Sequence, residues 1–158
     1  MNKQSSSFIA NRDHRKLKQL ATEFRLAIEK CQGVRTIIVT FSNFPRGSCG
    51  EASLFLAKYL EENNCGCFNY ILGDREGRSH AWLEQGDVIV DITADQFDDN
   101  DQPVIVTVNH NWHSQFSGEV QHVANLDGYD KYNSALLRSG YETILKEIKR
   151  APQSENKL

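Results

Sequence analysis

Three residues of this chain carry side chains suited to nucleophilic acyl transfer: Cys49, His80 and Asp91. Cys49 follows a turn-forming stretch, Ser42–Ser48, at the point where a helix is predicted to begin. A helix N-terminus carries about half a positive charge and presents free N–H groups. Both features favour the thiolate, which is the nucleophilic form, and the N–H groups could stabilise an oxyanion. The alternative interpretation is that Cys49 is a small buried hydrophobic residue.

His80 and Asp91 belong to two alternating segments on either side of Gln85-Gly86. If these two residues form the loop of a hairpin, with glycine where positive φ is needed, the register pairs His80 with Asp91 and Trp82 with Ile89. Directly opposed side chains have Cβ atoms about 4.5–5.5 Å apart, which an imidazole–carboxylate hydrogen bond can bridge. The other face is then apolar and predicted to face the core: Ala81, Leu83, Val88, Val90 and Ile92.

A histidine near a cysteine can take or share its proton, and a carboxylate orients the imidazole and stabilises the imidazolium. The sequence therefore predicts a triad in which Cys49 is the nucleophile, His80 the base and Asp91 the orienting group. A simpler alternative is a cross-strand His–Asp pair on the surface, worth a few tenths of a kcal/mol.

The order of these motifs resembles the papain-like superfamily: a cysteine at a helix start, a histidine at a strand start and an Asp or Asn on the next strand. The stretch His80–Glu84 with its downstream aspartate looks most similar to the bacterial transglutaminase-like branch, which includes the leader-processing enzymes of lasso peptides. The resemblance covers Pro45 to Asp91, under a third of the chain. It implies the same three catalytic roles, and it implies that Asn43 stands where papain-like peptidases carry an oxyanion-hole glutamine.

Four further residues are expected around the oxyanion or the substrate: Asn43, Ser48, Gly50 and Trp82. No metal and no cofactor are expected. Cys65 and Cys67 with His110 and His113 offer four soft ligands, the number that a structural zinc needs, but the cysteine spacing is too short and loop roles are preferred. The acidic residues 95–101 lack the spacing and the glycine of a calcium loop and are expected to be solvated.

Helices are predicted over residues 11–31, 49–62 and 129–150, from apolar residues at spacings of three and four. Strands are predicted over 34–41, 67–72, 79–84, 87–93, 104–109 and 118–123. The inward side chains of the last helix are expected to include Tyr132, Leu136, Leu137, Tyr141 and Ile144. Residues 1–10 are expected to be a flexible lead-in, 11–150 a single catalytic-type domain, and 151–158 a disordered tail. The fold class is α+β, with helices packed on an antiparallel sheet as in papain-like and transglutaminase-like enzymes.

The composition is that of an ordinary globular protein, with 158 residues, 39% hydrophobic residues and a net charge of -3. Nothing in it favours a nucleic-acid or a membrane partner. The N-terminus lacks a secretory h-region, and the four cysteines do not form a disulfide framework, so a cytoplasmic location is expected.

Two functions remain open from the sequence. One is hydrolysis of a peptide or side-chain amide through a Cys49 thioester, with a peptide or protein as substrate; protease, deamidase, transglutaminase and acyltransferase are not separated. The other is a catalytically inactive interaction module that keeps the fold.

Overall fold

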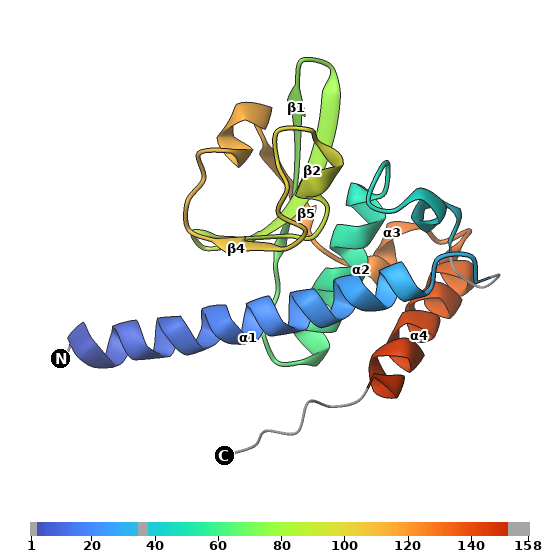
Figure 1. Cartoon of the computed structure of the whole chain (residues 1–158), viewed down its shortest axis with the longest axis horizontal. Coiled ribbons are helices and arrows are strands. Elements are labelled where there is room, and N and C mark those ends of the chain that lie inside the picture. Colours follow the sequence, from blue (N-terminus) through green and yellow to red (C-terminus); the bar gives the residue numbers. More distant parts are fainter. Residues whose placement is uncertain (1–2, 35–37, 152–158) are drawn as a thin grey trace.

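The structure is a computed structural model that describes residues 3–34 and 38–151. It is an α+β fold in which helices cover one face of a five-stranded antiparallel sheet (Figure 1). The strands are β1 (Asn69–Arg75), β2 (Arg78–Gln85), β3 (Val88–Asp91), β4 (Ile105–Thr107) and β5 (Glu119–Val123). Their order across the sheet is β4-β3-β2-β1-β5.

The helices are α1 (Lys3–Lys30), α2 (Cys49–Glu62), α3 (Leu126–Tyr129) and α4 (Ser134–Arg150). Three short 3₁₀ helices lie in connecting segments: η1 (Val39–Asn43) between α1 and α2, η2 (Ala94–Gln96) between β3 and β4, and η3 (His113–Phe116) between β4 and β5. In the described part of the chain, no helix is both long enough and apolar enough to cross a lipid bilayer.

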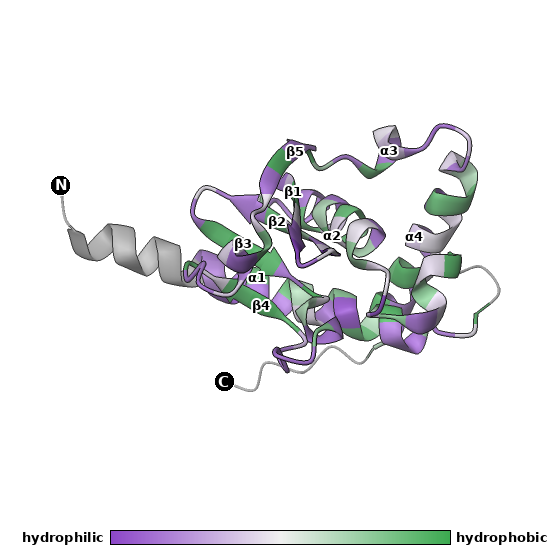
Figure 2. Ribbon diagram, turned by 90° about the horizontal axis from the view of Figure 1, so that it is seen from above, coloured by the Kyte–Doolittle hydropathy of each residue, from purple (hydrophilic) through white to green (hydrophobic). Residues whose placement is uncertain are grey.

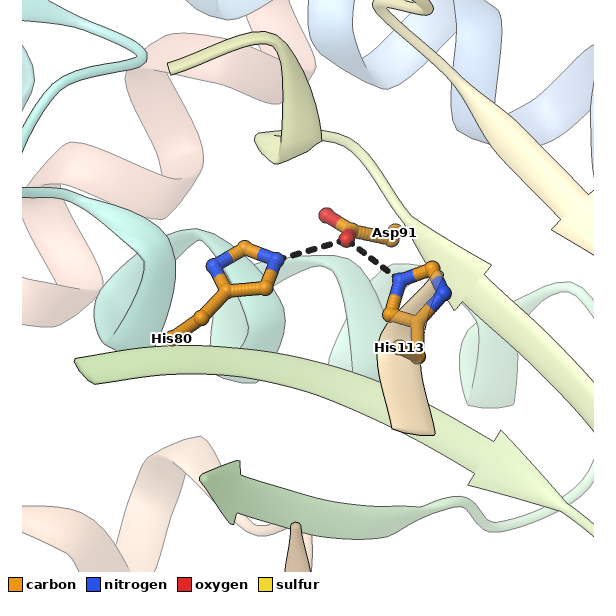
Figure 3. A group of neighbouring side chains, drawn as sticks. All are labelled: His80, Asp91 and His113. Carbon is orange, nitrogen blue, oxygen red and sulfur yellow. Dashed lines mark hydrogen bonds and ion pairs between the residues drawn. The ribbon is translucent and has the colours of Figure 1, made fainter. Parts of the chain in front are cut away.

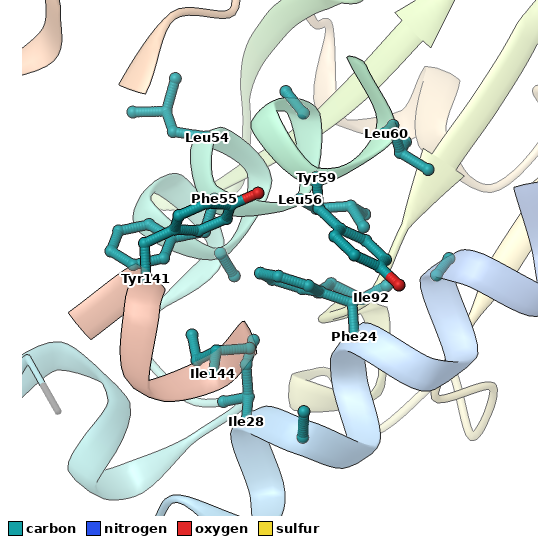
Figure 4. Close-up of a cluster of buried hydrophobic side chains, with 14 of the residues drawn as sticks. Phe24, Ile28, Leu54, Phe55, Leu56, Tyr59, Leu60, Ile92, Tyr141 and Ile144 are labelled. Atoms are coloured by element: carbon teal, nitrogen blue, oxygen red, sulfur yellow. The ribbon is translucent and has the colours of Figure 1, made fainter. Parts of the chain in front are cut away.

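The main core lies between the sheet and helices α1, α2 and α4 (Figure 4). The stripe predicted for α1 is confirmed, because Phe24, Ala27 and Ile28 are all buried. Helix α2 is buried almost all round, which is typical of a central helix. Helix α4 has one buried side, and its ribbon alternates between hydrophobic and hydrophilic residues in Figure 2.

The apolar face predicted for the β2–β3 hairpin is also confirmed: Leu83, Val90 and Ile92 join the main core. The opposite face of the sheet carries a second, smaller core that the segment after β3 covers. Its members are Ile71, Trp82, Ile89, Phe97 and Phe116, with Trp112 packed against them. His80 and Asp91 lie on this second face and are buried by it rather than exposed at the surface.

The hairpin register differs from the predicted one by two residues. Leu83 pairs with Val90 and Gln85 with Val88, so Gly86-Asp87 forms the turn. Gly86 has φ +61 and occupies the first central position, where a type II′ turn needs glycine. Because a shift of two residues keeps every side chain on its face, His80 and Asp91 still lie on the same side of the sheet, now diagonal to each other.

The strand predicted over residues 34–41 is wrong where the structure describes it. Residues 39–43 form η1, and residues 35–37 lie outside the described part of the chain. Ile38, Phe41 and Phe44 are buried at intervals of three, and this spacing puts them on one side of a tight helical turn. These three apolar side chains therefore fill the core, although their segment forms no strand of the sheet.

The chain ends also differ from expectation. Helix α1 begins at Lys3, so residues 3–10 of the segment expected as a flexible lead-in are helical. The last helix, predicted over residues 129–150, begins only at Ser134 as α4, after the separate short helix α3. Tyr132, which lies between α3 and α4, is 99% exposed instead of inward. Leu136 is also exposed, whereas Leu137, Tyr141 and Ile144 are buried as predicted. In the tail, residues 152–158 lie outside the described part of the chain.

Candidate active site

The start of α2 leaves Cys49 beside unpaired backbone donors. The first helical hydrogen bond runs from the Ala52 N–H to the Ser48 carbonyl, at 2.9 Å. The N–H groups of Cys49, Gly50 and Glu51 therefore have no carbonyl partner inside the helix. Cys49 itself is partly exposed and carries a free thiol. This is the environment predicted for it, namely a reduced cysteine among outward-pointing N–H groups.

His80 and Asp91 form the hydrogen bond that the sequence predicted. His80 Nε2 lies 2.7 Å from Asp91 Oδ2, and both side chains are buried (Figure 3). The other Asp91 oxygen, Oδ1, accepts from the Thr93 backbone N–H at 2.8 Å and from the Thr93 hydroxyl at 3.3 Å. Because an ionised carboxylate only accepts, His80 Nε2 carries a hydrogen, and Nδ1 is the atom left to face Cys49.

A second histidine, which the sequence analysis had not placed here, shares the same carboxylate oxygen. His113 Nε2 lies 2.8 Å from Asp91 Oδ2, and His113 is buried at the start of η3 (Figure 3). The sequence analysis considered His113 only as a zinc ligand with Cys65, Cys67 and His110, and preferred a loop role for it. In the structure it is committed to Asp91, while the carbonyls of Cys65 and Cys67 accept from Gln85.

The three side chains His80, Asp91 and His113 are also close enough together to be considered as metal ligands. Two ligands about 2.0–2.1 Å from a tetrahedral ion lie roughly 3.3 Å apart. The contacts of Asp91 Oδ2 with the two Nε2 atoms are 2.7 and 2.8 Å, which are lengths of charge-assisted hydrogen bonds. The geometry therefore favours a hydrogen-bonded network in which Asp91 accepts from both rings.

The charges in this network are strongly coupled. Burial disfavours the imidazolium of His80, but the charge and hydrogen bond of Asp91 outweigh it, and Cys49 adds to the effect. Together they raise the pKa of His80 from 6.5 to about 9. Burial likewise disfavours the charged form of Asp91, yet His80 and His113 hold the pKa of Asp91 well below its usual range. At neutral pH the site thus contains an imidazolium next to Cys49 and a carboxylate behind it.

An aromatic cover keeps water from the His80–Asp91 pair. The ring of His80 contacts Phe97, Trp112 and Phe116 at centroid distances of 5.1, 5.7 and 5.2 Å. Arg75 lies 4.5 Å from the centre of the Phe116 ring and forms two hydrogen bonds to Asp99, which anchors the cover at its outer edge. A site of low dielectric strengthens the ion pair inside it.

Gln96, another residue that the sequence analysis missed, connects both halves of the site. Its Oε1 accepts from the Gly47 N–H at 3.4 Å, and its Nε2 donates to the Thr93 carbonyl at 3.0 Å and lies 3.3 Å from His80 Nδ1. The amide thus links the loop before Cys49 to the histidine. The only signal for Gln96 in the sequence is that its side chain is an amide. Its separation along the chain from Cys49 and His80 gave no reason to select it.

Three residues expected near the oxyanion have other roles. The indole N–H of Trp82 donates to Glu84 Oε1 at 2.9 Å within the second core, so it is not free for a substrate. The hydroxyl of Ser48 is buried and donates to the Pro45 carbonyl at 2.8 Å. Asn43 ends η1 with an exposed side chain, and among the described residues its amide has no hydrogen bond to the site. The fourth, Gly50, does lie in the first turn of α2, next to Cys49.

Comparisons with protein-family models, with curated proteins and with solved structures found no match for this chain.

Proposed function

We propose that this protein is a cysteine-nucleophile acyl-transfer enzyme that hydrolyses a peptide or side-chain amide through a thioester on Cys49. The observation that carries the proposal is the setting of His80, whose Nε2 lies 2.7 Å from Asp91 and whose pKa Asp91 and Cys49 together raise to about 9 despite its burial. A buried imidazolium with one ring nitrogen on a carboxylate and the other on a thiol is the arrangement that thiol catalysis requires.

In the proposed reaction, the Cys49 thiolate attacks the carbonyl carbon, a C–S bond forms, and the carbonyl π electrons move to oxygen. The oxyanion receives hydrogen bonds from the free N–H groups at the start of α2. The tetrahedral intermediate collapses, the C–N bond breaks, and the leaving amine takes the proton of His80. Water then gives a proton to His80 and attacks the thioester, which releases the acid and restores the thiolate.

The papain-like and transglutaminase-like resemblance belongs to this proposal. The α+β fold, the cysteine at the start of α2 and the histidine and aspartate on successive strands are consistent with it. The oxyanion-hole glutamine of papain-like peptidases has no match at Asn43, whose side chain is exposed.

An acyl-enzyme experiment tests the proposal. The protein is mixed with p-nitrophenyl acetate, and the burst of p-nitrophenolate and the intact mass are followed together. We expect one acetyl group on Cys49, and loss of both the burst and the adduct in Cys49→Ala. The matched control is Cys31→Ala, which removes a buried thiol from the core and should keep the burst. A Cys49→Ala variant with an undiminished burst would reject the enzyme and favour the interaction module.

A further inference from the structure

Tyr70 lies beside the start of α2 although nothing in the sequence connects it with Cys49. It belongs to β1 and is partly buried. A Cβ atom added at Gly50 would come within 3.0 Å of the Tyr70 hydroxyl, so the phenol reaches the first turn of the helix. The glycine at position 50 leaves the room that this hydroxyl occupies.

The hydroxyl has no competing partner in the described part of the chain. No hydrogen bond joins it to another described residue, whereas the hydroxyls of Tyr59 and Tyr141 are bonded to Glu23 and Glu62. The Tyr70 hydroxyl can therefore donate a hydrogen bond to a bound molecule.

The ring of Tyr70 is held in one orientation. It stacks on His122 of β5 with a centroid distance of 5.0 Å and an interplanar angle of 3°, and the two residues are paired across the strands. A donor on a strand with a stacked ring loses little conformational freedom when it makes its hydrogen bond.

The hydroxyl also stays protonated. Burial, the charge of a Cys49 thiolate, Tyr129 and Glu51 raise the pKa of Tyr70 to about 12. The phenol is therefore an O–H donor at every pH at which the imidazolium of His80 exists.

We propose that Tyr70 is a further catalytic residue, whose phenol O–H donates a hydrogen bond to the oxyanion formed when Cys49 attacks an acyl carbonyl. The inference rests on the proposed function. The oxyanion then has two kinds of donor, the backbone N–H groups at the start of α2 and the Tyr70 hydroxyl from β1.

Tyr70→Phe removes the hydroxyl and keeps the ring stack on His122. With p-nitrophenyl acetate as the acyl probe, we expect the acylation rate to fall about 10²-fold, the loss typical of one oxyanion donor. Alkylation of Cys49 by iodoacetamide forms no oxyanion, so its rate should stay at the wild-type value. Gly50→Ala, which displaces the hydroxyl, should show the same split, and Tyr59→Phe, which removes a core hydroxyl, should change neither rate.

Two results would overturn the role of Tyr70. One is wild-type acylation in Tyr70→Phe while Cys49→Ala has no burst; this rejects the tyrosine and leaves the proposed function intact. The other is an equal loss of acylation and alkylation in Tyr70→Phe, because the hydroxyl would then act on the thiol. A burst that persists in Cys49→Ala would instead reject the proposed function itself, and with it the inference.

Discussion

His80 is bonded differently at its two ring nitrogens, and this asymmetry organises the site. Nε2 donates to Asp91, while Nδ1 lies 3.3 Å from the Gln96 amide nitrogen and is the ring nitrogen left for an interaction with Cys49. When Nδ1 is deprotonated, Gln96 can donate to it; when it is protonated, it can donate to a thiolate. The carboxylate behind the ring decides which form dominates near neutral pH.

Replacing Asp91 with Asn should lower the pKa of His80. The carboxylate favours the imidazolium, so its removal leaves burial as the dominant influence, and burial favours the neutral ring. In the wild type, His80 should lose its proton near pH 9; in Asp91→Asn, it should lose it at a clearly lower pH. The measurement is an NMR titration of the imidazole C–H signals, with His80→Gln used for assignment.

A His80 resonance that titrates near pH 9 in both proteins would contradict the coupling. Circular dichroism and the core methyl signals serve as controls that the Asp91→Asn variant is folded. His113 still contacts position 91 in this variant, so the comparison tests the charge and not the loss of a whole network.

The His80–Asp91 pairing could be predicted because it depends on local alternation within one hairpin. The predicted loop was displaced by two residues, and the pairing survived because such a shift preserves the faces. Tyr70, Gln96 and His113 reach the site from β1, η2 and η3, and only tertiary packing brings these elements together. Their own sequence neighbourhoods contain no spacing that points to Cys49.

At the scale of the elements, Arg25 connects α1 with the segment that carries Gln96. Its guanidinium is bonded to both carboxylate oxygens of Asp95, at 2.6 and 2.7 Å, and to the carbonyls of Ile92 and Pro103, at 2.8 Å each. It also lies 5.1 Å from the centre of the Phe44 ring. One side chain thus fixes the position of η2 relative to α1. On the same face of the sheet, the Ser53 hydroxyl donates to the Ala81 carbonyl at 3.4 Å and connects α2 with β2 beside His80.

Arg25→Met should destabilise the protein by about 3 kcal/mol, at the lower end of the 3–5 kcal/mol lost when one partner of a buried ion pair is removed. The lower end applies because the Asp95 side chain keeps 19% of its surface exposed. Denaturant unfolding measures the loss. The double variant Arg25→Met/Asp95→Asn should recover part of it, because no unpaired charge then remains.

Asp127→Asn is the matched control, since it breaks the exposed pair with Lys58, in which the Asp127 side chain is 63% exposed. Its cost should stay below about 1 kcal/mol. If Arg25→Met were no more destabilising than this control, the buried pair would not be holding η2 in place.

The predicted helices and strands were right where the apolar pattern fits one kind of secondary structure and wrong where it fits two. The helix over residues 49–62 was predicted with its bounds, because apolar residues recur along its whole length. The β-branched stretch before it reads equally well as a strand or as core-filling turns. The structure has η1 there, because Ile38, Phe41 and Phe44 must all reach the same core.

At the scale of the whole molecule, the sheet separates two cores with different tasks. The larger core, between the sheet and helices α1, α2 and α4, holds Cys49's helix in place. The smaller core, on the other face, encloses the His80–Asp91–His113 network. The sequence predicted the larger core from periodicity. The smaller one joins the strand residues Ile71, Trp82 and Ile89 to aromatic residues from separate segments after β3, which carry no periodic signal, so the burial of His80 and Asp91 was not foreseen.

The pH profile of Cys49 alkylation by iodoacetamide tests the central claim most directly. It is measured in the wild type, His80→Ala and Asp91→Asn, with Cys31, Cys65 and Cys67 replaced by Ser in all three proteins so that only Cys49 reacts. If His80 stabilises the thiolate and Asp91 keeps His80 charged, the wild type is alkylated faster than His80→Ala at mildly acidic pH, and Asp91→Asn lies between the two. Three superimposable curves would contradict a coupled Cys49–His80–Asp91 triad.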